Sequence, residues 1–442
     1  MQQHRKRNKS LGLLELIAIA LGGMVGGGIF TILGVSVAMV GNLTPVAIII
    51  GGCIAALAAY SYVKLGVYYK DEGATYSFYK KTYPNSHFSA SVIGWFVVFG
   101  YISTLALYAY TFASYAISTT QFADNPLIRR GVALGIISLF TLINIWSVNG
   151  MGKLEDFMVY TKLLILGAIS FVLMRNGDTG IQKFLDTMAQ DAQSSGIMNI
   201  LIVASITFVA YEGFQLVINA VNEMKQPDKN IPRAIYSAIT LAIIIYLVIA
   251  LGALFAIPAK DLIQNKESAL AAGAGDVLGS IGSTLVIAGA LLATSSAISG
   301  TVFGSSRQVA AIAKDGYLPK FLSVIKGGTP RYATIAMAAT AAVLVIVGGL
   351  QLILEFGSVT FLIVSLLMAV ANYKIRTRTK SSRLLTILAI CGLTLGGILI
   401  LYYEFMNKWQ QMLAIIAIYI VLALGAWFYS KKVKHLNQPD NA

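Results

Sequence analysis

Long apolar runs separated by short polar segments make up most of the chain. A helix needs about 20 apolar residues to cross ~30 Å of hydrocarbon, and twelve runs approach or exceed that length. They lie at 12–40, 45–63, 89–120, 131–149, 154–174, 197–221, 234–256, 279–306, 332–350, 352–371, 384–404 and 409–430. The polar stretches at 175–196 and 257–278 are expected to be short external loops. The pattern predicts an all-α membrane protein with 12 transmembrane helices and no soluble domain.

Composition agrees with a membrane protein. Hydrophobic residues make up 57% of the chain and charged residues only 12%, whereas a soluble protein carries roughly a quarter of its residues charged. Lipid is therefore the expected partner for most of the surface. The net charge of +14 comes from Lys and Arg scattered between apolar runs, so we expect no nucleic-acid partner.

The distribution of these basic residues predicts the orientation. If the N-terminus is cytoplasmic, 25 of the 33 Lys and Arg fall in cytoplasmic segments, as basic residues do in membrane proteins. We therefore expect a multi-pass protein of the cell membrane, plasma or inner, with both termini inside and a cytoplasmic tail at 431–442. One basic residue, Lys162, lies within a run instead.

Histidine and cysteine are too sparse for most catalytic or metal chemistry. The three histidines, His4, His87 and His435, lie in polar segments, and Cys53 and Cys391 are far apart in the sequence. Membrane-embedded enzymes need a nucleophile with a base, or metal ligands. We expect no enzyme activity, no cofactor, no metal and no obligate protein partner.

A cluster of glycines interrupts the first run, at Gly22, Gly23, Gly26, Gly27 and Gly28. Each glycine costs a helix interior ~1 kcal/mol relative to alanine. Close helix packing is the alternative, because Gly22 and Gly26 have the small-xxx-small spacing. Three consecutive glycines favour an unwound helix.

A carboxylate beside a glycine marks the sixth run, in the sequence Tyr211, Glu212, Gly213. An acidic residue inside a membrane usually lines a pathway. The alternative is a neutral Glu212 that is hydrogen-bonded between helices.

The two interruptions occupy corresponding places. Gly27 and Glu212 each lie 15 residues after the start of their run, which is ~22 Å of helix and close to mid-membrane. The two runs enter the membrane from opposite sides. Paired breaks in inverted repeats indicate the binding site of a secondary transporter. Free N–H groups there attract a carboxylate and free C=O groups an ammonium, so a zwitterionic amino acid fits.

Lys162 lies about 12 Å into the fifth run. A snorkelling lysine is the alternative, but snorkelling favours helix ends, so we expect Lys162 to face a cavity. A buried lysine there could release and take up a proton or replace a bound metal ion. Hydroxyl groups at Ser295 and Ser296 in the eighth run could face the first break, although such residues often bond their own helix.

These motifs resemble those of the amino acid–polyamine–organocation (APC) superfamily. The resemblance rests on GGMVGGGIF, on FVAYEGF followed by NEMKQPDKNIPRAI, on RQVAAIAKDGYLP and, more weakly, on DEGATYSFYKK. It implies one LeuT-type transporter domain over 1–442 with discontinuous helices 1 and 6. The implied inverted repeats of five helices each span 11–174 and 197–371, followed by two peripheral helices at 384–430.

The fifth run, VYTKLLILG, is similar to that of the proton-coupled, broad-specificity amino acid transporters of the archaeal ApcT kind. This resemblance implies that Lys162 is the proton-coupling site, with Ser295 and Ser296 as hydroxyl neighbours. It also implies a substrate site formed by Gly26, Gly27 and Gly28 with Tyr211, Glu212 and Gly213. Many relatives have an acid where this chain has Gln215, which leaves the role of Glu212 open.

The expected function is import of amino acids by proton symport through alternating access. An amino acid or amine exchanger without net proton coupling is the alternative. The sequence does not identify the amino acid.

Overall fold

The computed structural model describes residues 11–146, 148–176, 180–265, 268–326 and 329–436. Within these ranges the chain forms helices and turns and no strand, so the predicted all-α class is confirmed. The long helices are α3 (Thr44–Tyr69), α5 (His87–Ile117), α6 (Pro126–Trp146), α7 (Val148–Asn176), α8 (Ile181–Thr207), α10 (Pro227–Ala256), α12 (Ala269–Lys314), α13 (Arg331–Val347), α14 (Leu350–Lys374), α16 (Arg383–Asn407) and α17 (Trp409–Leu436). The short helices are α1 (Leu13–Met24), α2 (Gly28–Val40), α4 (Ala74–Thr82), α9 (Leu216–Asn219), α11 (Ala259–Gln264) and α15 (Arg376–Thr379), and the 3-10 turns are η1 (Gly41–Leu43), η2 (Phe208–Tyr211) and η3 (Lys320–Ser323).

Most of these helices are long and apolar enough to span a bilayer. Ten helical stretches of the described chain meet that requirement, and the apolar helices α1 and α13 are shorter. Within the described residues, the predicted runs overlap long helices, the 17-residue α13, or an interrupted pair of helices. The chain is therefore a multi-pass membrane protein.

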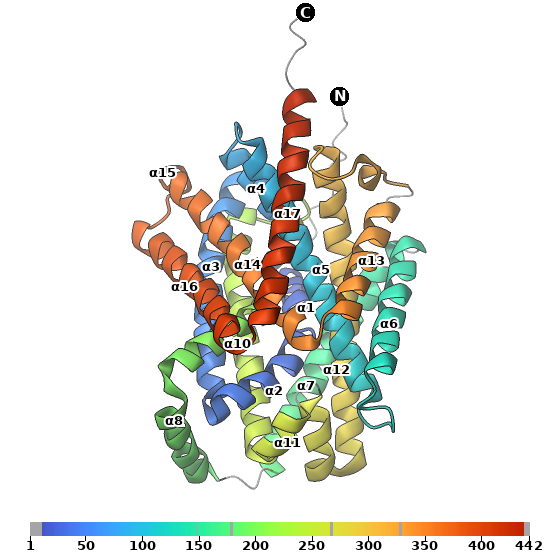
Figure 1. The fold of residues 1–442 in the computed structure, drawn as a ribbon, viewed down its shortest axis with the longest axis vertical. Helices are drawn as coiled ribbons and strands as arrows, with labels where there is room; N and C mark the ends of the chain where they lie inside the picture. Colours follow the sequence, from blue (N-terminus) through green and yellow to red (C-terminus); the bar gives the residue numbers. More distant parts are fainter. Residues whose placement is uncertain (1–10, 147, 177–179, 266–267, 327–328, 437–442) are drawn as a thin grey trace, which may run out of the picture.

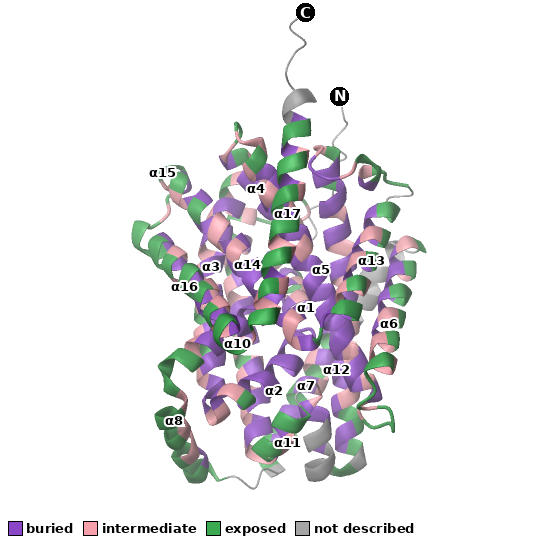
Figure 2. Ribbon diagram, viewed as in Figure 1, coloured by how far each residue is buried: buried purple, intermediate pink, exposed green. Residues whose placement is uncertain are grey.

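The long helices form a bundle with α5 near its centre (Figure 1). Of the apolar window in α5, 83% of the residues are buried, against 17% in α17. Figure 2 shows this contrast, with buried residues gathered in the interior and exposed residues along α16, α17 and the first half of α8. The helices that carry the two predicted breaks pack inside the bundle, whereas α16 and α17 lie at its periphery.

The two polar stretches expected to be short loops contain helix, so that expectation was wrong. The first half of α8 fills most of 175–196, and α11 together with the start of α12 fills much of 257–278. Glycines turn the chain at both places: Gly196 has φ +65° and Gly279 has φ +68°, a left-handed conformation that glycine adopts at least cost. Packing supports the first half of α8, since its Phe184 meets Phe255 of α10 at 4.9 Å between ring centroids.

The two ends of the bundle differ in which short elements cover them. The α4 end, at the top of Figure 1, carries α4, α15 and the C-terminal end of α17, and the α11 end, at the bottom, carries α11 and the first half of α8. At the α4 end, Leu11 pairs with the chain beyond α9: its N–H donates to Glu223 O and its carbonyl accepts from Lys225 N.

Candidate functional site

The first predicted break is present. Helix α1 ends at Met24 and α2 begins at Gly28, and Val25 between them has φ −81° and ψ +71°, far from helical values. Glycine is required here for space as well. A Cβ on Gly26 would lie 2.7 Å from Ala297 Cβ of α12 and 2.9 Å from the Tyr108 ring of α5. The helix is unwound, and the glycines also allow close packing.

The second predicted break is also present. The α8 helix tightens into η2, Glu212 is extended at φ −70° and ψ +139°, and Gly213 has φ +127°. Helix resumes only in α9, at Leu216. Because residues other than glycine rarely adopt that φ, Gly213 is the position that permits the turn.

The two breaks touch through their backbones. A Cβ on Gly213 would lie 2.6 Å from the carbonyl carbon of Gly23, and one on Gly28 would lie 2.9 Å from Ala210 Cβ. Tyr246 of α10 joins them as well, since its hydroxyl lies 2.7 Å from the carbonyl oxygens of both Met24 and Ala210. The breaks therefore form one structural unit, buried inside the bundle.

Side chains from three helices satisfy the carbonyl groups freed at the first break. Lys162 Nζ of α7 donates to Gly22 O at 3.1 Å and to Val25 O at 2.7 Å. The Tyr108 hydroxyl donates to Gly23 O at 3.1 Å, and Tyr246 serves Met24 O. Buried backbone oxygens need such partners, and every carbonyl from Gly22 to Val25 has one.

The backbone N–H groups freed at the start of α2, unlike the carbonyl groups of the first break, lack partners in the described part of the chain. Among the described residues, the structure shows no acceptor for the backbone N–H groups of Gly27, Gly28 and Ile29, and the first turn of α2 closes only with Thr31 N to Gly27 O at 3.2 Å. These N–H groups lie at the N-terminal, positive end of the α2 dipole. The arrangement is chemically suited to an anion.

Lys162 faces the first break, against the carbonyl groups of Gly22 and Val25. Its side chain has 0% exposure, so the snorkelling alternative is excluded. Ser296 is also buried, and its hydroxyl lies 3.5 Å from Lys162 Nζ, at the outer limit of a hydrogen bond. The adjacent Ser295 is half-buried, whereas Thr294 bonds carbonyl groups of its own helix.

The Glu212 carboxyl group is buried and turned toward its own segment. Its Oε2 accepts from Gln215 Nε2 at 2.8 Å, and Gln215 Oε1 accepts from Gly213 N at 3.1 Å. Its Oε1 has no hydrogen-bond partner. Tyr62, Tyr101 and Tyr108 are close enough to interact electrostatically with the carboxyl group. Gln215 therefore holds Glu212 in place.

Tyr211 has a different environment from the other predicted residues. Its hydroxyl donates to Ile48 O of α3 at 2.8 Å, and its ring lies 5.2 Å from that of Tyr246. The side chain thus fastens the second break to α3.

No sequence pattern predicts the roles of Tyr108 and Tyr246. Both are single tyrosines in apolar runs, in a chain with 22 tyrosines. Their roles depend on contacts between α1 and helices that follow it by 85 and 222 residues, which no local pattern predicts.

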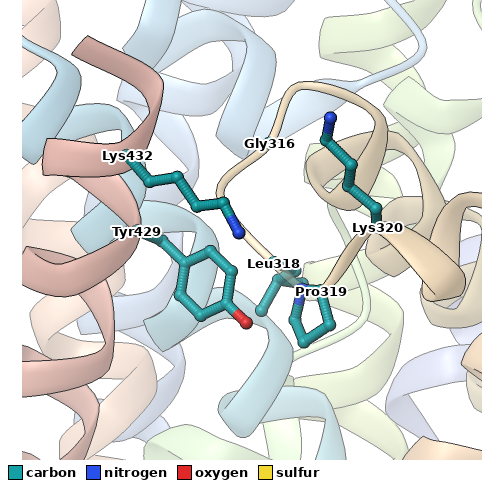
Figure 3. Close-up of a pocket in the computed structure, with 6 residues that line it drawn as sticks. All are labelled: Gly316, Leu318, Pro319, Lys320, Tyr429 and Lys432. Carbon is teal, nitrogen blue, oxygen red and sulfur yellow. The ribbon is translucent and has the colours of Figure 1, made fainter. Parts of the chain in front are cut away.

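Elsewhere, a cavity of about 240 Å³ opens beside Pro319 at the α4 end. Figure 3 shows Tyr429 and Lys432 of α17 facing the loop that contains Gly316, Leu318, Pro319 and Lys320. This cavity is remote in sequence from both breaks. No group of three or more His, Cys, Asp or Glu that could hold a metal ion occurs in the described part of the chain.

Known proteins resemble this chain in sequence. The model of the amino acid permease family matches residues 11–409. An uncharacterized protein of Methanocaldococcus jannaschii is 29% identical over 97% of both chains, and the inner membrane transport protein YbaT of Escherichia coli is 29% identical over 91% of both. The rabbit large neutral amino acids transporter small subunit 2 is 27% identical over 72% of this chain and 60% of its own. The chain belongs to the amino acid permease family and is a membrane transporter of the APC superfamily.

Proposed function

We propose that the protein imports amino acids together with a proton by alternating access across the plasma or inner membrane. The observation that carries this proposal is the contact between two interrupted helices inside the bundle, with Lys162 buried against one of them. The proposed topology has twelve spans with both termini cytoplasmic. In it, residues 11–174 and 197–371 form two inverted repeats, and α16 and α17 are peripheral.

The proposed substrate site combines Gly26, Gly27 and Gly28 with Tyr211, Glu212 and Gly213. Free N–H groups at the start of α2 would hold the substrate carboxylate, since the helix dipole adds a favourable potential there. Glu212 Oε1, buried and unpartnered, would accept from the ammonium group. Tyr108 supports this pairing, because its ring touches the Gly26 and Gly27 positions and it also interacts with Glu212.

Lys162 is the proposed proton-coupling residue, with Ser295 and Ser296 beside it. An ammonium group has three N–H donors, and the oxygens that accept from it include Gly22 O, Val25 O and Ser296 Oγ. A neutral amine has only two N–H donors and a lone pair. Loss of the proton would leave two N–H donors for Gly22 O and Val25 O, while the Ser296 hydroxyl donates to the lone pair. The bonds to the first break would then lose their positive charge, and a charged donor forms a stronger hydrogen bond than a neutral one. In this way the proton would change the stability of the break.

Uptake of labelled amino acid into proteoliposomes tests the proposal. An inward proton gradient should drive accumulation by the wild type, and Lys162→Ala should abolish accumulation while counterflow exchange persists. Ser296→Ala should weaken the dependence on pH, because the Ser296 hydroxyl lies 3.5 Å from Lys162 Nζ.

Two outcomes would contradict the coupling assignment. Unchanged, still concentrative uptake by Lys162→Ala would remove the role of this lysine. Strong acceleration by internal substrate, together with indifference to the proton gradient, would instead identify an exchanger without net proton coupling. A competition panel of the twenty amino acids against one labelled substrate would identify the preferred side chain.

A further inference from the structure

A second buried polar cluster lies away from the two breaks, between α14 and α16. Glu355 of α14 and Glu404 of α16 both have 0% exposure. Their carboxyl groups are close enough for a hydrogen bond to each other. Buried carboxylates are rare unless they are paired with a cation or carry a function.

The hydrogen bonding of this pair is incomplete. Glu355 Oε1 accepts from Gln351 Nε2 at 2.7 Å, but Glu355 Oε2 and both oxygens of Glu404 are buried without a partner. Two ionised carboxylates offer only acceptors. A hydrogen bond between them therefore requires a proton on one of them, and two adjacent negative charges inside a membrane protein repel each other strongly.

The surrounding charges favour a single added proton. Lys408, at the end of α16, is the cation that interacts with the pair, and Tyr403 is a further ionisable neighbour. From α17, the Tyr419 hydroxyl is bonded to Thr360. Among the described residues of α3, α5 and α8, no charged side chain interacts electrostatically with Glu355. One proton leaves the pair with one negative charge, which Lys408 balances.

We propose that Glu355 and Glu404 form a proton-binding site, in which one proton is shared between the two carboxyl groups. A metal ion fits this cluster less well. Ca²⁺ takes six to eight oxygen ligands, whereas two carboxyl groups and one amide supply at most five. The site is separate from Lys162 and does not depend on the proposed function.

The position of the Glu355–Glu404 pair links it to the helices near the second break. Three residues after Glu355, the Ser358 hydroxyl of α14 donates to Ile206 O of α8 at 2.7 Å, just before the second break. A Cβ on the intervening Gly357 would lie 2.8 Å from Ser103 Oγ of α5. The shared proton thus fastens the peripheral helix α16 to α14, which packs directly against η2 at the second break.

Infrared difference spectroscopy of the full-length protein across a pH titration tests this site. The C=O stretching band of a protonated carboxyl group should be present at neutral pH and disappear at alkaline pH. Glu355→Gln should remove one carboxyl equivalent of that band, Glu404→Gln should remove the same equivalent, and the double variant should remove no more. The reason is that a glutamine amide can donate to the remaining carboxylate, which then needs no proton. Glu212→Gln is the control and should leave this component unchanged.

If one of these substitutions prevents folding, a variant of the neighbouring Lys408 still tests the proposal. Lys408→Gln, on a half-buried residue, should keep the band to higher pH because it removes the positive charge that favours ionisation. The proposal is overturned if the two glutamine substitutions reduce the band additively, if neither changes it, or if Lys408→Gln leaves the titration unchanged. Thermal stabilisation by Na⁺ or Ca²⁺ that is lost in Glu404→Gln would identify a metal site in its place.

Discussion

Single tyrosine residues replace the helical hydrogen bonds that the two breaks lack. Tyr246 shares its single O–H between one carbonyl of each break, Met24 O and Ala210 O, and Tyr108 donates to Gly23 O. An unpaired carbonyl in a buried site costs about 1–3 kcal/mol. The broken helices therefore depend on side chains that come from other parts of the chain.

Removing the Tyr246 hydroxyl should loosen both breaks. We expect Tyr246→Phe to lower the free energy of unfolding by about 1–3 kcal/mol and to reduce the maximal uptake rate. Tyr236→Phe, on the same helix and half-buried, is the matched control. Thermal unfolding and initial uptake rates measure the two effects. Equal stability and uptake in Tyr246→Phe and the control would show that the bridging hydroxyl is unimportant.

A second residue-scale prediction concerns Gly213. An alanine there would be strained at φ +127°, and its Cβ would lie 2.6 Å from the backbone of Gly23. We expect Gly213→Ala to cost at least about 1–3 kcal/mol and to abolish uptake by forcing the breaks apart. Gly131→Ala is the control, because no atom lies within 4 Å of its added Cβ. In a helix that change should stabilise the protein by about 1 kcal/mol, so the two substitutions should have opposite signs in thermal unfolding.

At the scale of helices, the sequence predicts most of what local energetics determine. Apolar runs mark the long helices because lipid requires them, and the glycine cluster and the Glu212–Gly213 pair mark the breaks because helix is unfavourable there. The helices in 181–195 and 259–264 are missed, since polar composition alone does not separate a surface helix from a loop. Tyr246 and the Glu355–Glu404 pair are missed for another reason: each depends on contacts between helices that are distant in the chain.

The junction between α3 and α4 gives a prediction about pH. Burial of Asp71 opposes its ionisation, but a salt bridge from Lys81 and the Gly73 N–H at 2.7 Å outweigh burial and lower the pKa of this carboxyl group. A lowered pKa in the folded state stabilises the protein above the ordinary pKa of aspartate, and this contribution is lost as pH falls through the folded value.

We therefore expect Asp71→Asn to destabilise the protein at neutral pH, by less than about 1 kcal/mol because the pair is partly exposed. The difference from the wild type should shrink as the pH approaches that at which Asp71 takes up its proton. Thermal unfolding from neutral to acid pH measures it, with Asp124→Asn, in the turn before α6, as the control. A difference that grows in acid would contradict the assignment.

At the scale of the whole molecule, polar contacts fasten both ends of the bundle. At the α4 end, Asp315 accepts from the Tyr76 hydroxyl at 2.7 Å and from Lys80 Nζ at 2.8 Å, which joins α4 to the end of α12. At the α11 end, Asp191 of α8 accepts from the backbone and the side chain of Asn42, at 2.8 and 3.1 Å. A carrier that works by alternating access must open one end at a time, so each set of contacts is expected to hold its own end closed.

Charge-removing substitutions at the two ends should therefore have opposite effects on access to the centre. The reporter is a cysteine introduced by Thr111→Cys, beside the first break. The exposed Cys53 and Cys391 are first replaced by serine. An impermeant maleimide then labels the reporter from one side of the membrane. Asp315→Asn should raise labelling from the α4 side, and Asp191→Asn should raise it from the α11 side. Loss of about 1 kcal/mol in closing energy corresponds to a rise of roughly fivefold. If both variants raised labelling from the same side, separate closure of the two ends would be contradicted. Contacts that close opposite ends should, when removed, expose the centre to opposite sides.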